Sequence, residues 1–160
     1  MENVSMHEKA IVLERSIQND LKVIAEIFED IGTSPITAGT PEADLIVLAY
    51  RLHNLYNAFE NIFQQIATTF ENSLDDPARW HAQLLHRMQL DLMPMRPAVI
   101  DADAYEKLDE LRRFRHLFRS AYRVKLDARR LQLVLEKALE LRPIYGQQIE
   151  KFLNFLRSLQ

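Results

Sequence analysis

Arginine and histidine are concentrated in one short segment, RRFRHLFRSAY, which runs from residue 112 to residue 122. Guanidinium groups suit phosphates because they remain charged and donate paired hydrogen bonds. An imidazole among them can accept a proton near neutral pH. The segment therefore has the residue types that bind a phosphate or another anion. The same pattern also occurs on the solvated face of an ordinary amphipathic helix, or where a basic face pairs with acids on neighbouring helices.

Helical geometry places these charges on one side of the segment. At about 100° per residue, the basic side chains fall within an arc of about 100°. This basic stripe consists of Arg112, Arg115, His116, Arg119 and Arg123. The apolar side chains fall roughly opposite, and they are Leu111, Phe114, Phe118 and Ala121. Tyr122 lies at the border of the stripe, and Arg113 alone departs from it. We therefore expect the apolar side to face a core and the basic stripe to face outward.

The charge of the whole chain hides this local excess. The formal net charge is −3, yet residues 112–130 contain eight Lys or Arg and one acid, a net of +7. The rest of the chain must then carry −10. An acidic protein with one basic segment is expected to meet an anionic partner through that segment, if it meets one at all.

Several kinds of chemistry lack their residues in this sequence. The chain has no cysteine, which excludes disulfides, thiolate nucleophiles and cysteine-based metal sites. It has no glycine-rich phosphate loop and no Ser-His-Asp constellation. His53, His81 and His86 lie in separate helical contexts, and histidines five residues apart do not share a helix face. We therefore expect neither a metal ion nor a cofactor. Asp109 and Glu110 could orient Arg113 by an ion pair.

The elements that must position these residues are amphipathic helices, because apolar residues recur at spacings of three and four. The first helix is expected over about residues 6–30, and the loop GTSPITAGTP follows it. Thr40 as the N-cap and Pro41 at the first helical position predict a second helix that reaches about residue 70. A shorter third helix is expected over about residues 78–92.

Two more helices complete the predicted fold. Asp101 or Asp103 can cap the fourth, which carries the basic stripe, and Asp127 can cap the fifth after a turn near Lys125. Pro143 is expected to kink the last segment. The sequence shows no alternating pattern of strands and no internal repeat. It predicts an all-α, up-and-down bundle of about five helices, formed as a single domain over residues 1–160.

We also expect a soluble, cytoplasmic protein. The N-terminus has no basic region followed by an apolar run, as a signal peptide would have. No stretch approaches the roughly 18–20 uninterrupted apolar residues that a membrane span needs.

The segment RHLFRSAY resembles the motif of the HEPN superfamily, whose members are small α-helical bundles and often metal-independent ribonucleases. That motif is an Arg, often followed by a polar residue, then a His four to six residues further on, sometimes with a Tyr two residues later. Arg115, His116 and Tyr122 match the Arg, the polar residue and the Tyr, while Ser120 stands where the His is expected. The wider stretch LDELRRFRHLFRSAYRVKLD resembles the HepT-like branch.

The resemblance implies an endoribonuclease toxin that cleaves RNA through the ribose 2′-hydroxyl and acts as a homodimer. It also implies a minimal nucleotidyltransferase as the antitoxin, which could adenylylate Tyr122. The motif match makes Arg115, His116 and Ser120 catalytic candidates, and Arg112 joins them because it lies four residues before His116 on the same face. Arg119 and Arg123 are expected to contact RNA phosphates because of their place in the basic stripe.

Ser120 leaves two interpretations of this site. A serine is not an effective acid or base near pH 7, so His116 would take that role, paired with Arg112 four residues earlier on the same face. Alternatively, the domain is a weak or inactive nuclease that binds RNA or a nucleotide, or that docks on an acidic partner protein. We favour the first interpretation, in which His116 is the acid or base.

Overall fold

The computed structural model describes residues 4–71, 79–120 and 126–160, and its elements in these ranges are five α-helices. They are α1 (Met6–Ile31), α2 (Glu42–Phe70), α3 (Trp80–Met88), α4 (Ala102–Ser120) and α5 (Ala128–Ser158). The described ranges contain no β-strand, apart from an isolated bridge between Leu92 and Arg96. The predicted all-α bundle is therefore confirmed.

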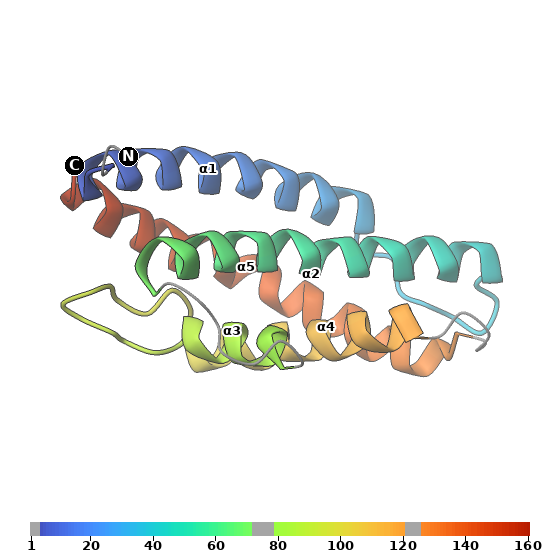
Figure 1. Ribbon diagram of the computed structural model, residues 1–160. Coiled ribbons are helices and arrows are strands. Elements are labelled where there is room, and N and C mark those ends of the chain that lie inside the picture. Colours follow the sequence, from blue (N-terminus) through green and yellow to red (C-terminus); the bar gives the residue numbers. More distant parts are fainter. Residues whose placement is uncertain (1–3, 72–78, 121–125) are drawn as a thin grey trace.

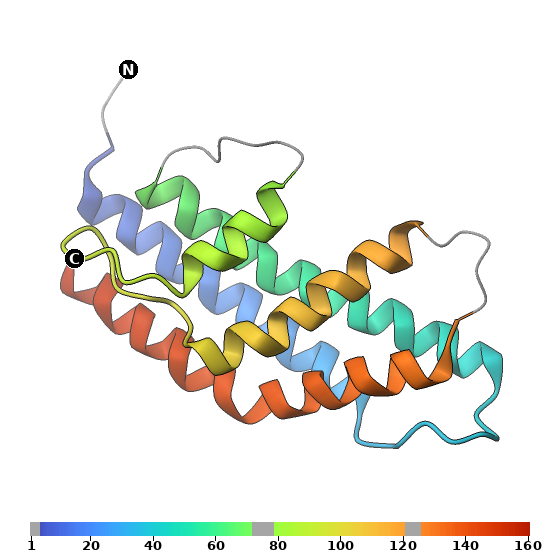
Figure 2. The ribbon, with the colours of Figure 1, turned by 90° about the horizontal axis from the view of Figure 1, so that it is seen from below.

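Four long helices run alternately up and down, and the short α3 lies against them (Figure 1). α1 packs on α2, α4 packs on α5, and both pairs join through further contacts of α2 with α4 and α1 with α5. Seen from below, α3 and α4 lie on the same side of the bundle and both cross α2 (Figure 2). This arrangement makes α2 the element against which α3 and α4 are both positioned.

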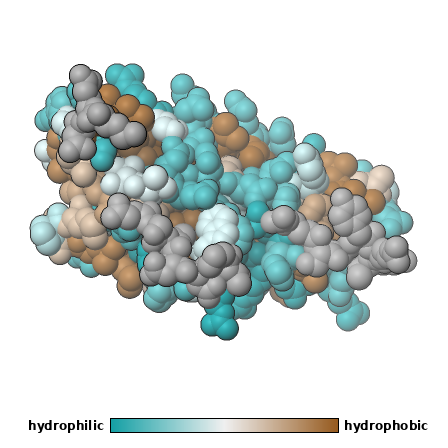
Figure 3. Space-filling model, in the orientation of Figure 1, coloured by the Kyte–Doolittle hydropathy of each residue, from teal (hydrophilic) through white to brown (hydrophobic). Residues whose placement is uncertain are grey.

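Apolar side chains at helical spacing fill the space between the helices. The rings of Phe28, Phe59 and Tyr145 bring α1, α2 and α5 together, with centroids 5.3 Å apart for Phe28–Tyr145 and 5.2 Å apart for Phe59–Tyr145. Such aromatic pairs add a little to the larger free energy of burial. On the outside, Figure 3 shows hydrophobic patches separated by hydrophilic surface. No helix among the described residues is long and apolar enough to cross a membrane.

The helix caps agree with the sequence at two of three starts. Asp127 caps α5 by accepting a hydrogen bond from the Arg129 amide at 2.9 Å. Asp101, rather than Asp103, caps α4 by accepting from the Ala104 amide at 2.9 Å. The expected Thr40 cap of α2 is wrong, because Pro41 is the N-cap and the Thr40 hydroxyl accepts instead from the Thr37 amide. The Thr40 hydroxyl is engaged in the turn of residues 37–40 and therefore does not cap α2.

α3 ends at Met88, four residues before the predicted end at 92. The Met88 carbonyl accepts hydrogen bonds from the amides of Val99 and Ile100, so the returning chain caps the helix. The predicted start, at residue 78, lies outside the described residues. Pro143 lies inside α5, which stays continuous and bends near its middle (Figure 2).

Candidate functional site

The N-terminal two-thirds of α4 is fixed by its apolar side. Leu108 and Leu111 are fully buried and Phe114 nearly so, which confirms that this side of the helix faces the core. The opposite side differs from the expectation. His116 is exposed as predicted, but Arg112 and Arg115 are only half exposed, because each reaches a polar partner beside it.

Asp109 holds two of the arginines. Its Oδ1 accepts from Arg112, with Nε at 2.9 Å and the terminal nitrogen at 2.8 Å, and its Oδ2 lies 2.8 Å from Arg113. Arg113 also lies 3.5 Å from Glu110. The predicted pairing of Arg113 with these two acids is confirmed. Asp109 is buried and its charge offsets part of the basic stripe, so Arg112 keeps a fixed position on the helix.

Arg115 is attached to α2 rather than to its own helix. Its Nε donates a hydrogen bond to the Oδ1 of Asn57, and the Asn57 amide nitrogen lies 3.1 Å from Nε2 of His53. The His53 ring lies 5.2 Å from the ring of Phe118 on α4. Asn57 of α2 therefore fixes Arg115 through its Nε, on one side of the guanidinium group.

Tyr56 lies buried beneath these arginines. Its pKa is raised well above the ordinary value, first by burial and then by the charge of Glu60. The charges of Arg112 and Arg115 act in the opposite direction and lower it. The phenol is therefore neutral at physiological pH, and the charges of Glu60, Arg112 and Arg115 all act on the same hydroxyl group.

Glu60 and His81 form a pair that the sequence interpretation missed. Nδ1 of His81 lies 2.9 Å from each carboxylate oxygen of Glu60, so α3 contributes an imidazole next to α2. The Glu60 side chain is 7% exposed and that of His81 is 29% exposed. One signal could have found Glu60: it follows Tyr56 by four residues and precedes Phe63 by three, on the buried side of α2, where a carboxylate needs a partner.

The other predicted site residues lie at or beyond the end of the described part. Arg119 and Ser120 belong to α4, but their side chains lie outside the description. Tyr122 and Arg123 lie outside the described residues altogether. The structure therefore places Arg112, Arg115 and His116 on one helix. It adds Asn57, which binds Arg115, and the Glu60–His81 pair, whose carboxylate lies three residues further along α2. In the described part of the chain, no three His, Asp or Glu side chains are grouped as metal ligands.

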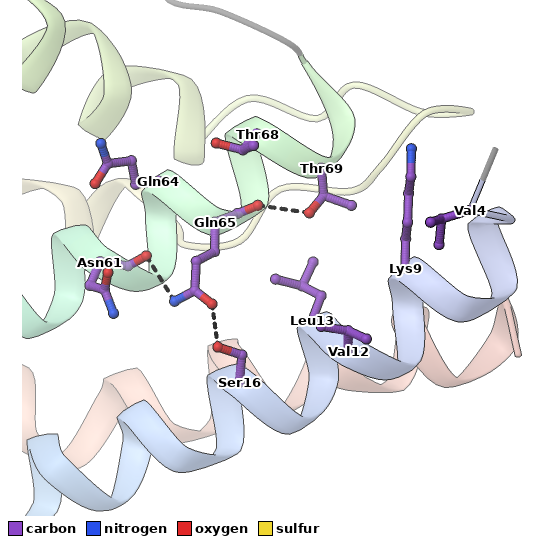
Figure 4. Close-up of a pocket in the computed structure, with 10 residues that line it drawn as sticks. All are labelled: Val4, Lys9, Val12, Leu13, Ser16, Asn61, Gln64, Gln65, Thr68 and Thr69. Atoms are coloured by element: carbon purple, nitrogen blue, oxygen red, sulfur yellow. Dashed lines mark hydrogen bonds between the residues drawn. The ribbon is translucent and has the colours of Figure 1, made fainter. Parts of the chain in front are cut away.

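A cavity of about 490 Å³ lies elsewhere, between α1 and the C-terminal half of α2 (Figure 4). Its polar groups are largely engaged: Gln65 accepts a hydrogen bond from Ser16 and donates to the Asn61 carbonyl, and Thr69 donates to the Gln65 carbonyl. Lys9 is the one charged side chain among its described lining residues. The cavity offers no imidazole or carboxylate, so we place the candidate site between α2, α3 and α4.

The family model described as HepT-like protein matches residues 47–156, which include most of α2 and all of α3 and α4. The match covers more than half of the chain and contains every side chain of the candidate site. No curated protein and no solved structure matches this chain.

Proposed function

Because the chain belongs to the HepT-like protein family, we propose that it is a HEPN-type endoribonuclease that cleaves RNA without a metal ion. The observation that carries this proposal is that Arg112 and Arg115, three residues apart on α4, are each held in place, Arg112 by Asp109 and Arg115 by Asn57 of α2. Two fixed guanidinium groups next to each other can bind the oxygens of one phosphodiester and stabilise the charge that develops on it.

In the proposed reaction the ribose 2′-oxygen attacks the adjacent phosphorus and the bond from phosphorus to the 5′-oxygen breaks. The products are a 2′,3′-cyclic phosphate and a free 5′-hydroxyl. His116 takes the proton of the 2′-hydroxyl, in place of the motif histidine that Ser120 replaces. A second group must supply a proton to the leaving 5′-oxygen.

We propose that the protein acts as a homodimer, in which each copy is a single domain formed by residues 1–160. An exposed apolar patch next to the candidate site supports the dimer, since exposed apolar patches often mark protein–protein interfaces. It consists of Ile46, Val47 and Tyr50 on α2 and Leu117 on α4. The first three line a cavity together with Phe118, which also contacts His53. A twofold axis here would bring two basic stripes to one RNA.

The cellular role follows from the same family membership. We propose that the protein is a cytoplasmic toxin, and that a minimal nucleotidyltransferase is its antitoxin. Adenylylation of Tyr122 would put a bulky, negatively charged group beside the arginines and would compete with RNA phosphates for them. Arg119 and Arg123 would extend the phosphate contacts along the stripe.

The test is cleavage of short labelled RNA in EDTA by the wild type, Arg115→Ala and His116→Ala. We expect cleavage by the wild type with cyclic-phosphate ends, and losses on the order of 10²-fold in each variant. Arg15→Ala, which removes an exposed charge on α1, is the matched control and should cleave normally. Retained activity in His116→Ala would remove this histidine from the mechanism.

Ser120 favours one second candidate, an RNA-binding domain that has lost cleavage. It predicts RNA affinity that falls steeply with salt, since phosphate contacts dominate such binding, and no cyclic-phosphate product. Absence of both cleavage and binding would contradict both candidates and direct the search to a protein partner.

A further inference from the structure

A buried carboxylate, Glu60, and the partly exposed imidazole of His81 form a pair on α2 and α3, three residues along α2 from the asparagine that binds Arg115, and the α4 motif accounts for neither. We propose that His81, oriented by Glu60, belongs to the phosphodiester site of Arg115 and donates the proton that the leaving 5′-oxygen requires. This inference rests on the proposed ribonuclease function.

The spacing along α2 brings the two groups together. Asn57 and Glu60 are three residues apart, about 4.5 Å along the helix axis, and residues at this spacing are neighbours on one face. Asn57 accepts a hydrogen bond from Arg115 of α4, and Glu60 pairs with His81 of α3. A guanidinium group and an imidazole from two different helices are thus held within about one turn of the same helix.

The electrostatic environment of Tyr56 supports the same juxtaposition. Burial raises the pKa of the Tyr56 hydroxyl, the charge of Glu60 raises it further, and the charges of Arg112 and Arg115 lower it. The Glu60 carboxylate and both guanidinium groups are therefore near enough to Tyr56 to act on the same group. His81 lies 2.9 Å from that carboxylate and is the more exposed member of the pair.

The pairing decides which nitrogen of His81 can act. A carboxylate accepts hydrogen bonds and cannot donate them, so Nδ1 must carry a hydrogen toward Glu60. Nε2 is left to face other groups, and in the protonated ring it is an N–H donor. Glu60 is the counter-ion of that protonated ring, as a carboxylate is in other histidine-dependent sites.

Two histidines with different neighbours give the two proton transfers of the reaction. His116 lies on the arginine-bearing helix and is assigned as the base, whereas the ring of His81 is oriented by the Glu60 carboxylate and His81 is assigned as the acid. The 2′-oxygen gains its bond to phosphorus and loses its proton to His116. The bond from phosphorus to the 5′-oxygen breaks, and that oxygen takes the proton of Nε2 of His81. One proton is taken up by His116 and one is given up by His81, so the step balances without a metal ion or a co-reactant.

The decisive experiment compares an ordinary RNA linkage with one in which sulfur replaces the bridging 5′-oxygen. A thiolate leaves without protonation, so loss of the acid slows the oxygen linkage and spares the sulfur linkage. His81→Asn keeps an N–H donor for Glu60 and removes proton transfer. We expect it to cleave the oxygen linkage on the order of 10²-fold more slowly and the sulfur linkage at the wild-type rate. His116→Ala should lose both.

The controls separate this role from a structural one. His86→Ala removes an exposed histidine of the same helix and should leave both rates unchanged. Glu60→Gln keeps a hydrogen-bonding group and removes the charge, so it should lower kcat on the oxygen linkage, leave KM unchanged and spare the sulfur linkage. Equal losses on both linkages in His81→Asn, or no loss on either, would overturn the assignment.

A binding measurement keeps the inference independent of nuclease activity. An oligonucleotide with 2′-deoxyribose at the cleavage position cannot react, and its binding can be followed by the ¹⁵N resonances of His81. We expect Nε2 of His81 to shift in the wild type and to remain unchanged in Arg115→Ala. A wild type that cleaves nothing but shows this Arg115-dependent shift would refute the nuclease and retain the shared phosphodiester site. A His81 resonance that does not respond would refute the shared site.

Discussion

At the scale of single residues, Asp109 sets how much positive charge the basic stripe presents. It is buried and it pairs with both Arg112 and Arg113, so part of their charge is offset by an acid on the same helix. Asp109→Asn removes the negative charge and leaves one carbonyl oxygen as acceptor. We expect tighter binding of single-stranded RNA and a salt dependence steeper by about 0.7 in the logarithmic slope, as one released counterion gives. Fluorescence anisotropy over a series of salt concentrations measures both.

The matched control for this change is Glu26→Gln, which removes one exposed acid from α1. It alters the net charge of the protein by the same amount, away from the candidate site. If Asp109→Asn and Glu26→Gln had the same effect on RNA affinity, the net charge would explain it and the position of Asp109 would not matter.

At the scale of elements, Arg96 fixes the connection from α3 to α4. Its side chain is 0% exposed and donates to the carbonyls of Arg87, Leu90 and Pro97, and it pairs with Glu71 at 2.8 Å. Arg96→Met would leave the buried carboxylate of Glu71 without this partner. We expect a loss of about 3–5 kcal/mol in the free energy of unfolding, because breaking a buried pair on one side is costly. Urea unfolding followed by circular dichroism measures it.

Arg113→Met is the comparison for that variant. Arg113 pairs with acids on its own helix and its side chain is 56% exposed, so its loss should cost less than about 1 kcal/mol. A comparable loss in the free energy of unfolding in both variants would mean that the buried Arg96–Glu71 pair stabilises the fold no more than an exposed pair does.

At the scale of the whole molecule, the first and last helices are joined at one end of the bundle (Figure 1). Glu14 of α1 accepts hydrogen bonds from Gln160 at 2.9 Å and from Arg157 at 2.6 Å. The bond from Gln160 is the largest cause that lowers the pKa of Glu14, burial opposes it, and Arg157 lowers it further. The ionised carboxylate therefore stabilises the closed bundle.

The sign of the pH dependence follows from that lowered pKa. The contribution of Glu14 is fully present above its ordinary pKa of 4.5 and is lost as the pH falls through the lower native value. We expect Glu14→Gln to be less stable than the wild type at neutral pH and to lose less stability on acidification below about pH 5. Urea unfolding at several pH values gives both results. Parallel curves for the two proteins would contradict the role assigned to Glu14.

Much of the fold is determined by local patterns in the sequence. The five helices, the cap of α5 at Asp127 and the core side of α4 at Leu111 and Phe114 follow from spacing and from short-range hydrogen bonding. The pairing of Arg113 with Asp109 also follows, since the two residues are one helical turn apart. Where such local rules compete, as between a turn and a helix for the Thr40 hydroxyl, the sequence alone assigned the wrong partner.

The composition of the candidate site depended on the tertiary structure. Arg115 and Asn57 are 58 residues apart in sequence, and His81 and Glu60 are 21 apart, so helical periodicity within one segment carries no information about either pair. The sequence by itself determined that α4 is a helix with an apolar side toward the core and with Arg112, Arg115 and His116 on the other side. Which polar groups contact these side chains was decided only by the packing of α3 and α4 on α2. Contacts between residues of different helices depend on the position and rotation of each helix, which the pattern within one segment does not specify.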